Sequence, residues 1–455
     1  MLALLACQTP RAPGVRDAID WTKPPAPRAE ARFVAPPIES FVLSSGVRVL
    51  VVENQRLPIA TLLAINRGAG SRGAAPGLAA LTASLLADGA GPLDRDAFAS
   101  ALESLGATVD IDIASDHATL TVSTLANHLA DAIHLLGEAL LRPRFDEADL
   151  ARARSERAAE LAMHAGQLRI VAAQRFDRLV FGDHPYGHPA EGDLAMTAYG
   201  PDEVRAAWSR AYGPTTTTLI VVGAVTHSSL QPALEAAFGH WTNPPPPPAA
   251  PPAGAQSPAL AYVDRPGDEV AIVIGRRIAP VDHARLAADL ANAALGGIDG
   301  PLQRSVGAGT AIGASFWRGE LGGTWSVATA VKLDAAAPTI RAILHTIEQA
   351  RTTGLTDAEL VHARALLLRA LPTAFETNTG VAHALQRLVV QGLPIDHYAT
   401  YADDLAAITP AQARAAIAPL WTGLSIVVVG DWSRLGPALA ALGLPPATGD
   451  ARSGR

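Results

Sequence analysis

The chain has 455 residues, of which 49% are hydrophobic and 17% charged, and its formal net charge is −7. This length exceeds what one hydrophobic core usually supports, and it favours two domains of about 200 residues each. The composition excludes a disordered chain, and the negative charge without a long basic run excludes a nucleic-acid partner. Cys7 is the single cysteine, so neither a disulfide framework nor a cysteine-based zinc site can form within the chain.

The chain opens on MLALLACQTP, in which LLAC at residues 4–7 resembles the bacterial lipobox, whose cysteine is lipidated after a signal peptide is removed. The apolar run before Cys7 is short for a signal peptide and has no basic residues. We favour a lipid anchor on Cys7 in a bacterial cell envelope, facing the periplasm, because a Pro-rich tether follows it. The alternative is a frayed cytoplasmic N-terminus. Residues 1–37 are assigned to this signal and tether, and no other stretch is long and apolar enough to span a bilayer.

Residues 38–243 are predicted to form an α+β domain. The segments at 46–54 (GVRVLVVEN) and 59–70 (IATLLAINRGAG) have the apolar, β-branched pattern of two neighbouring strands. The segments at 109–115 and 117–125 alternate with period two, which favours antiparallel strands with one covered face. Helical spacing follows in LADAIHLLGEALLR and in ADLARARSERAAELAMHAGQL. The expected fold is a mostly antiparallel sheet with helices packed on one face.

The rest of the chain is predicted to repeat this domain. A Pro-rich linker at 244–258 precedes a second domain at 259–446 and a tail at 447–455. FDEADLARARSERAAEL, from Phe145, matches LTDAELVHARALLLRAL, from Leu355, 210 residues later. TTLIVVGAV, with Gly223, matches LSIVVVGDW, with Gly430, 207 residues later. Two matches at nearly equal offsets indicate duplication.

Several segments in this order carry a family resemblance. They are GVRVLVVEN, ALESLGATVDIDIASDHATLTVSTL, LLRPRFDEADLARARS, HPYG at 184–187, LIVVGAV and, in the second half, LGGIDGPLQRSV. Together they resemble the insulinase (pitrilysin) family of zinc peptidases over about residues 38–445. The resemblance implies two homologous α+β domains.

Active members of that family carry an HxxEH motif on the first helix. Two His at i and i+4 hold zinc from one helix face, the Glu beside them acts as general base, and a distant Glu is the third ligand. In GLAALTASLLADGAG, at 77–91, these positions fall on Ala80, Ala83 and Ser84, so the motif is lost. The third-ligand position falls on Glu160, interpreted as a vestigial, solvated helix residue, and a supporting Glu position falls on Ala153. We therefore expect no metal or other cofactor in this chain.

In heterodimeric members of the family, one subunit bears zinc and the other supplies an Arg and a Tyr that bind substrate or stabilise the intermediate. In GPLQRSVGAGTAIGASFW, at 300–317, these two positions fall on Gly307 and Ile312. Arg304 or Arg318 is a possible replacement for the lost Arg, although an ordinary exposed Arg is the favoured interpretation of both. The substrate-binding residues are therefore left open. HPYG is interpreted as architectural, because Pro185 and Gly187 interrupt any helix there.

The leading hypothesis is a non-catalytic insulinase-family subunit that pairs with an active, zinc-bearing subunit as a heterodimer, or with itself, and helps to enclose a peptide. The first alternative is a lipid-anchored peptide-binding or scaffold protein without a peptidase partner. The second is an active zinc metallopeptidase with a different ligand set. A membrane is a partner only if Cys7 carries a lipid.

Overall fold

The structure is a computed structural model that describes residues 33–193, 198–246, 250–252, 254, 257–280, 285–307 and 309–441, and the backbone of 447–450. Cys7 and the predicted signal and tether up to residue 32 lie outside these described residues. Ala35–Arg455 forms one compact unit. None of the helices in the described part of the chain combines the length and the hydropathy that crossing a membrane requires.

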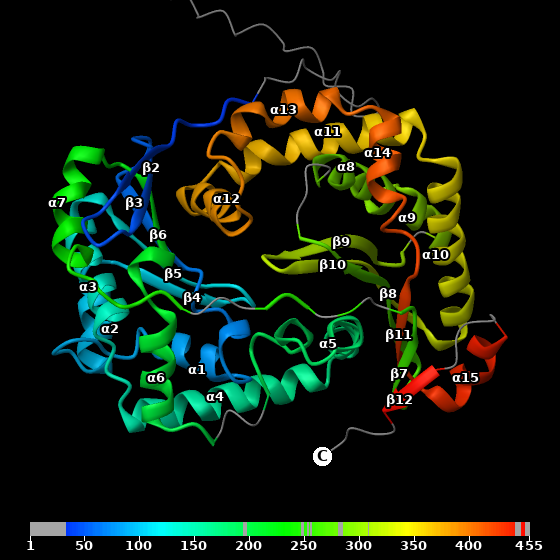
Figure 1. The fold of residues 1–455 in the computed structure, drawn as a ribbon, viewed down its shortest axis with the longest axis horizontal. Helices are drawn as coiled ribbons and strands as arrows, with labels where there is room; N and C mark the ends of the chain where they lie inside the picture. Colours follow the sequence, from blue (N-terminus) through cyan, green and yellow to red (C-terminus); the bar gives the residue numbers. More distant parts are fainter. Residues whose placement is uncertain are drawn as a thin grey trace, which may run out of the picture. The chain divides into compact units, whose positions relative to one another are not determined.

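Two six-stranded sheets and the helices around them make up this unit (Figure 1). The strands are β1 (Glu39–Val42), β2 (Arg48–Glu53), β3 (Ile59–Asn66), β4 (Thr108–Ile113), β5 (Ala118–Leu125), β6 (Thr217–Gly223), β7 (Leu260–Asp264), β8 (Glu269–Ile278), β9 (Ile312–Gly319), β10 (Gly322–Lys332), β11 (Ser425–Gly430) and β12 (Ala447–Asp450). The helices before the linker are α1 (Leu78–Ser84), α2 (Arg95–Ser104), α3 (Leu129–Leu141), α4 (Glu147–Ala165), α5 (Leu168–Phe181), α6 (Pro201–Ala211) and α7 (His227–Phe238), with the short 3₁₀ turns η1 (Ser71–Gly73) and η3 (Pro185–Gly187). Those after it are α8 (Arg285–Gly296), α9 (Pro301–Val306), α10 (Leu333–Thr353), α11 (Asp357–Ala374), α12 (Asn378–Val390), α13 (His397–Ala407), α14 (Pro410–Ile417) and α15 (Trp432–Ala440).

The first sheet has the strand order β1-β2-β6-β3-β5-β4. The predicted antiparallel pairing of the strands at 109–115 and 117–125 is confirmed by β4 and β5. The prediction that the segments at 46–54 and 59–70 are neighbours is wrong, because β6 lies between β2 and β3, parallel to the first and antiparallel to the second. Every residue of β6 is buried, which is typical of a central strand covered on both faces.

The second sheet repeats the first. Its order is β12-β7-β11-β8-β10-β9, so that β7, β11, β8, β10 and β9 take the places of β2, β6, β3, β5 and β4. The pairing senses agree as well, with β7 parallel to β11 and the others antiparallel. The additional strand β12 falls in the segment that the sequence assigned to a tail, and it pairs parallel to β7.

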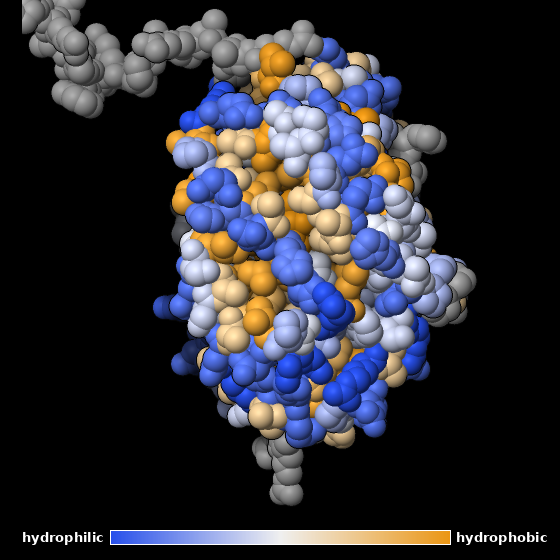
Figure 2. Space-filling model, turned by 90° about the vertical axis from the view of Figure 1, so that its left-hand side faces the viewer, coloured by the Kyte–Doolittle hydropathy of each residue, from blue (hydrophilic) through white to orange (hydrophobic). Residues whose placement is uncertain are grey.

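The predicted class, two homologous α+β domains with mostly antiparallel sheets, is confirmed by this architecture. On one face of the first sheet, the largest apolar cluster joins strand residues such as Val49 and Leu62 to α1, α2, α3 and α7. On the corresponding face of the second sheet, α8, α10 and α11 pack in the same way. On the outer side that carries α3 and α7, apolar side chains are interspersed with hydrophilic ones (Figure 2).

The opposite face of each sheet is covered by a helix from the other half. Phe176 and Val180 of α5 pack on Val273 and Val427 of the second sheet. Leu385 of α12 and its apolar neighbours pack on the first sheet, against Leu50, Leu63 and Ile220. Because α5 and α12 begin 210 residues apart, this exchange is reciprocal and follows the duplication. Each half therefore completes the core of the other.

Candidate functional site

In this chain, α1 holds the positions at which active insulinase-family members carry the zinc motif. It begins after Gly77, whose φ of 76° lies in the left-handed region that favours glycine. Ala80 and Ala83 are buried, at 0% and 1% relative exposure, and Ala83 belongs to the first-half core. The Ser84 hydroxyl donates to the Leu81 carbonyl oxygen at 3.0 Å, within its own helix. This face of α1 consequently offers two methyl groups and one internally bonded hydroxyl.

The other two family positions lie on α4, which contacts α1. Ala153 is buried in the same cluster as Ala83. Glu160 is an ion-pair partner rather than a solely solvated residue, because Nη1 of Arg157 donates to its Oε2 at 2.8 Å and its side chain is 41% exposed. Ala153 is thus part of the core, and Glu160 is part of a local ion pair.

These residues do not fit a catalytic zinc ion. Zinc in such sites takes three nitrogen, sulfur or oxygen ligands from the protein, whereas Ala80 has no donor atom, the Ser84 hydroxyl bonds within its own helix and Glu160 already pairs with Arg157. Across the described residues, no group of three or more His, Cys, Asp or Glu side chains is arranged to hold a metal ion. His184 and His188 are engaged separately, with the Tyr186 amide and with Arg178 respectively.

The two second-half positions also lack the expected chemistry. Gly307 follows α9 with φ of 89°, and a β-carbon there would meet no atom within 4 Å. Ile312 is the first residue of β9 and is half-buried. Neither residue presents a polar side chain.

Arg304 and Arg318 both hold structural positions. Arg304 donates to the Asp299 carbonyl oxygen at 2.5 Å and pairs with Glu359. The interpretation of Arg318 as an ordinary exposed residue is wrong, since its side chain is 12% exposed, pairs with Asp289 at 2.5 Å and stacks on the Phe316 ring. These contacts already use the guanidinium groups within the chain.

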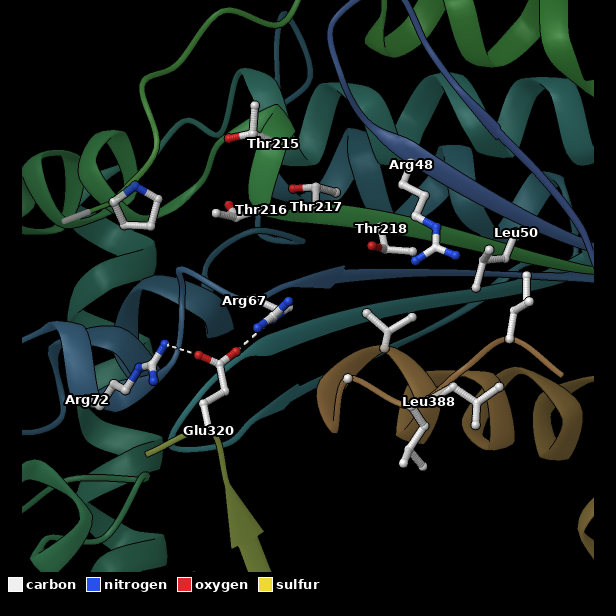
Figure 3. A pocket seen from close by; sticks show the side chains of 15 residues that line it. Arg48, Leu50, Arg67, Arg72, Thr215, Thr216, Thr217, Thr218, Glu320 and Leu388 are labelled. Atoms are coloured by element: carbon white, nitrogen blue, oxygen red, sulfur yellow. Dashed lines mark hydrogen bonds and ion pairs between the residues drawn. The ribbon is translucent and has the colours of Figure 1, made fainter. Parts of the chain in front are cut away.

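Sequence reasoning missed a buried polar network between the halves. Asp116, in the turn between β4 and β5, accepts from the Tyr186 hydroxyl at 2.6 Å and from the Glu320 amide at 2.9 Å. Arg72 in η1 joins this network, 3.0 Å from Asp116 and 2.6 Å from Glu320. Figure 3 shows Glu320 between Arg72 and Arg67, with which it also pairs at 2.6 Å. The network thereby fixes the β9–β10 turn against the first half.

Burial shapes the electrostatics of the network. Asp116 and Tyr186 are 4% and 3% exposed. Burial, followed by the hydrogen bond to Asp116, raises the pKa of the Tyr186 hydroxyl well above its usual value. Although burial alone would lower the pKa of Arg72, the nearby Asp116 and Glu320 raise it. Two cations and two carboxylates therefore balance one another, with Tyr186 as a neutral donor. The tyrosine of HPYG was the available sequence signal, but its partners come from distant segments.

Comparisons with known proteins agree with this architecture. A family model described as insulinase (peptidase family M16) matches residues 49–192, and one described as the peptidase M16 inactive domain matches residues 199–367. An uncharacterised zinc protease of Mycobacterium bovis is 24% identical over 300 residues, which cover 64% of this chain and 68% of that protein. A similarly named Mycobacterium leprae protein is 24% identical over 190 residues, 41% of each chain.

Solved structures show the same fold. A peptidase M16 inactive domain from Pseudomonas fluorescens has a TM-score of 0.81 at 22% identity and covers 86% of this chain and 98% of its own. A protease from Helicobacter pylori has a TM-score of 0.78 at 17% identity, covering 87% and 100%. The fold is that of a duplicated peptidase-like protein. The chain belongs to the insulinase family, peptidase family M16.

Proposed function

We propose that this chain is a non-catalytic insulinase-family subunit, which pairs with an active zinc-bearing subunit and helps to enclose a peptide. The observation that carries the proposal is the α1 face, on which Ala80 and Ala83 pack in place of a metal site while the surrounding family fold is retained. A chain that keeps both domains without the chemistry retains surfaces for binding and assembly.

The sheet edges support a peptide-binding role. β4 pairs only with β5 among the described strands, and β9 only with β10, so each presents one backbone edge that is not used in its sheet. An extended peptide can add to such an edge through main-chain hydrogen bonds. Since α1 contacts β4, a peptide on that edge would run beside the Ala80–Ser84 face.

Co-expression with a family member that has an intact HxxEH motif tests the pairing. The expected result is that the two chains co-elute and that the pair cleaves a peptide faster than the active chain alone. A variant of the partner with Gln in place of its motif Glu serves as control, because it should co-elute without cleaving. A monodisperse chain that leaves the partner's cleavage unchanged would contradict the proposal and favour an unpartnered scaffold.

Metal analysis of the purified chain tests the missing site. We expect no stoichiometric zinc and no peptide cleavage by this chain alone, because α1 supplies no ligand. Glu160→Gln should change neither result, and Glu156→Gln, on the same helix, is the matched control. One tight zinc ion per chain that Glu160→Gln removes and Glu156→Gln does not would overturn the proposal.

A further inference from the structure

A cavity of about 560 Å³ opens where α12 ends on the first sheet. It lies beside the apolar interface between α12 and β2, β3 and β6, and it is of the size that small-ligand sites usually have. Figure 3 shows that its walls come from β2, the start of β6, the β9–β10 turn and α12.

One wall is cationic and hydroxylic. Arg48 of β2 lies opposite Thr218 of β6 in the sheet register, so both side chains project from the same face. Figure 3 shows the Arg48 guanidinium directed toward Thr218 and Leu50. Among the described residues, the Arg48 side chain makes one long polar contact, 3.4 Å from its Nε to the Ser40 hydroxyl, and no carboxylate lies within ion-pair distance of it.

The other cations of the cavity are already neutralised. Arg67 and Arg72 both bind Glu320, and Arg72 also binds Asp116. The cavity therefore has one uncompensated positive charge, that of Arg48. A single carboxylate matches this charge better than a dianionic phosphate group does.

The facing wall is apolar. Leu50 lies next to Arg48 on the same strand face, and Leu388 and Val389 of α12, with Leu393 and Ile395 of the following loop, complete the wall. A ligand that places a carboxylate on Arg48 would bury an adjacent hydrocarbon group here.

The equivalent place in the second half is built from different residues. The register places Ala259 at the position of Arg48 and Ser425 at that of Thr218. The segment after α5, which corresponds to the loop after α12, inserts Tyr186 against Trp317 and Phe181, with ring centroids 4.8 and 5.5 Å away. The two copies therefore differ at this place, where the first half has the cation Arg48 and the second half has Ala259 in the register and a packed Tyr186.

We propose that this cavity binds the C-terminal carboxylate of a peptide whose last side chain is apolar. The carboxylate accepts hydrogen bonds from the Arg48 guanidinium and the Thr218 hydroxyl, and the last side chain packs on Leu388, Val389 and Leu393. This inference rests on the proposed peptide-binding function, and it specifies which end of the peptide is held.

Fluorescence anisotropy on the purified full chain, without a partner, tests the inference. The probes are an N-terminally labelled peptide that ends in Leu with a free carboxylate and the same peptide as a C-terminal amide. The amide should bind at least about tenfold more weakly, because it loses a charge-assisted hydrogen bond. Arg48→Gln should weaken binding of the free acid to the level of the amide. Arg56→Gln, an exposed Arg of the same half outside the cavity, should leave the preference intact.

Four results would overturn the inference. They are equal affinity for acid and amide, no binding of either, an acid preference that survives in a folded Arg48→Gln variant, and tighter binding of free decanoate than of the peptide. The last would assign the cavity to a free fatty acid. Equal affinity for acid and amide leaves the proposed peptide binding intact, whereas failure of the proposed pairing is seen separately in the co-elution experiment.

Discussion

At two junctions, α5 and α12 each cover the sheet of the other half. The two junctions arose from the same duplication, but the residues that follow the two helices differ. At the α5 junction, Phe181, Tyr186 and Trp317 fill the space beyond the helix, and Tyr186 continues into the network with Asp116. At the α12 junction, the chain beyond the helix lines a cavity with Leu393 and Ile395. One junction is thus a closed structural contact, and the other keeps an open, partly polar space.

This difference shows how one copy of a duplicated contact can stabilise the fold while the other copy keeps space for a ligand. The buried aromatic and ionic contacts at the α5 junction hold the halves together, so substitutions there should affect the free energy of unfolding. The α12 junction has Gln386 at the position that corresponds to Phe176, and this polar side chain lies 3.2 Å from His117 Nε2. Substitution of Gln386 should therefore cost less stability than substitution of Phe176.

The largest expected effect distinguishes these two equivalent positions. Phe176→Ala should lower the free energy of unfolding by about 3–5 kcal/mol, because a ring that is 2% exposed leaves a cavity between α5 and the second sheet. Gln386→Ala should lower it by about 1 kcal/mol or less. Guanidinium chloride unfolding of both variants measures the contrast, and equal losses would show that the junctions do not differ in this way.

The hydroxyl of Tyr186 should have an intermediate effect. Tyr186→Phe leaves the buried Asp116 with one donor fewer and the Leu321 amide without its acceptor at 3.1 Å, at a cost of about 1–3 kcal/mol. Tyr262→Phe is the control, because its ring stacks on Trp432 and its hydroxyl makes no hydrogen bond within the described part of the chain. If Tyr186→Phe and Tyr262→Phe have the same thermal unfolding temperature, the network does not stabilise the α5 junction.

The third expected effect is a pH dependence specific to α5. Burial raises the pKa of Asp177 from an ordinary value of 3.8 to about 7, whereas the corresponding residue of α12 is Arg387. Between these two pKa values the folded chain holds a proton that the unfolded chain has released. The Asp177 contribution to the free energy of unfolding therefore falls as the pH rises from about 4 to about 7, and is constant above.

Asp177→Asn should remove that contribution. Relative to the natural chain, the variant should become more stable as the pH is raised from 5 to 8, as measured by unfolding at each pH. Asp183→Asn, which changes an exposed carboxylate just after α5, should show no such trend. A pH-independent difference between Asp177→Asn and the natural chain would contradict the raised pKa.

Much of the fold was predictable from local pattern and from the internal repeat. The alternation at 109–115 and 117–125 predicted β4 and β5, and the 210-residue offset predicted a second copy of the domain. The insertion of β6 between β2 and β3 was missed, because strand order depends on contacts between distant segments. The uninterrupted apolar run at 219–222 was the available signal for a central strand.

The candidate sites were less accessible from sequence. The substitution of Ala80 and Ala83 was visible because a motif has a fixed spacing on one helix. The network of Arg72, Asp116, Tyr186 and Glu320 was not, since helical or strand periodicity within each segment carries no information about its distant partners. The same limit applies to Arg48, whose importance depends on the cavity that α12 forms beside it.

The reciprocal helix exchange also affects how the protein can be divided. Neither half covers its own sheet on both faces. A gene fragment that encodes one half would therefore produce a chain with one apolar sheet face exposed to solvent, and such a chain should aggregate. A single cut between Pro246 and Pro258 is a different event, because both halves are present and α5 and α12 still cover each other's sheets. The two nicked fragments should stay together on a sizing column and separate only in denaturant.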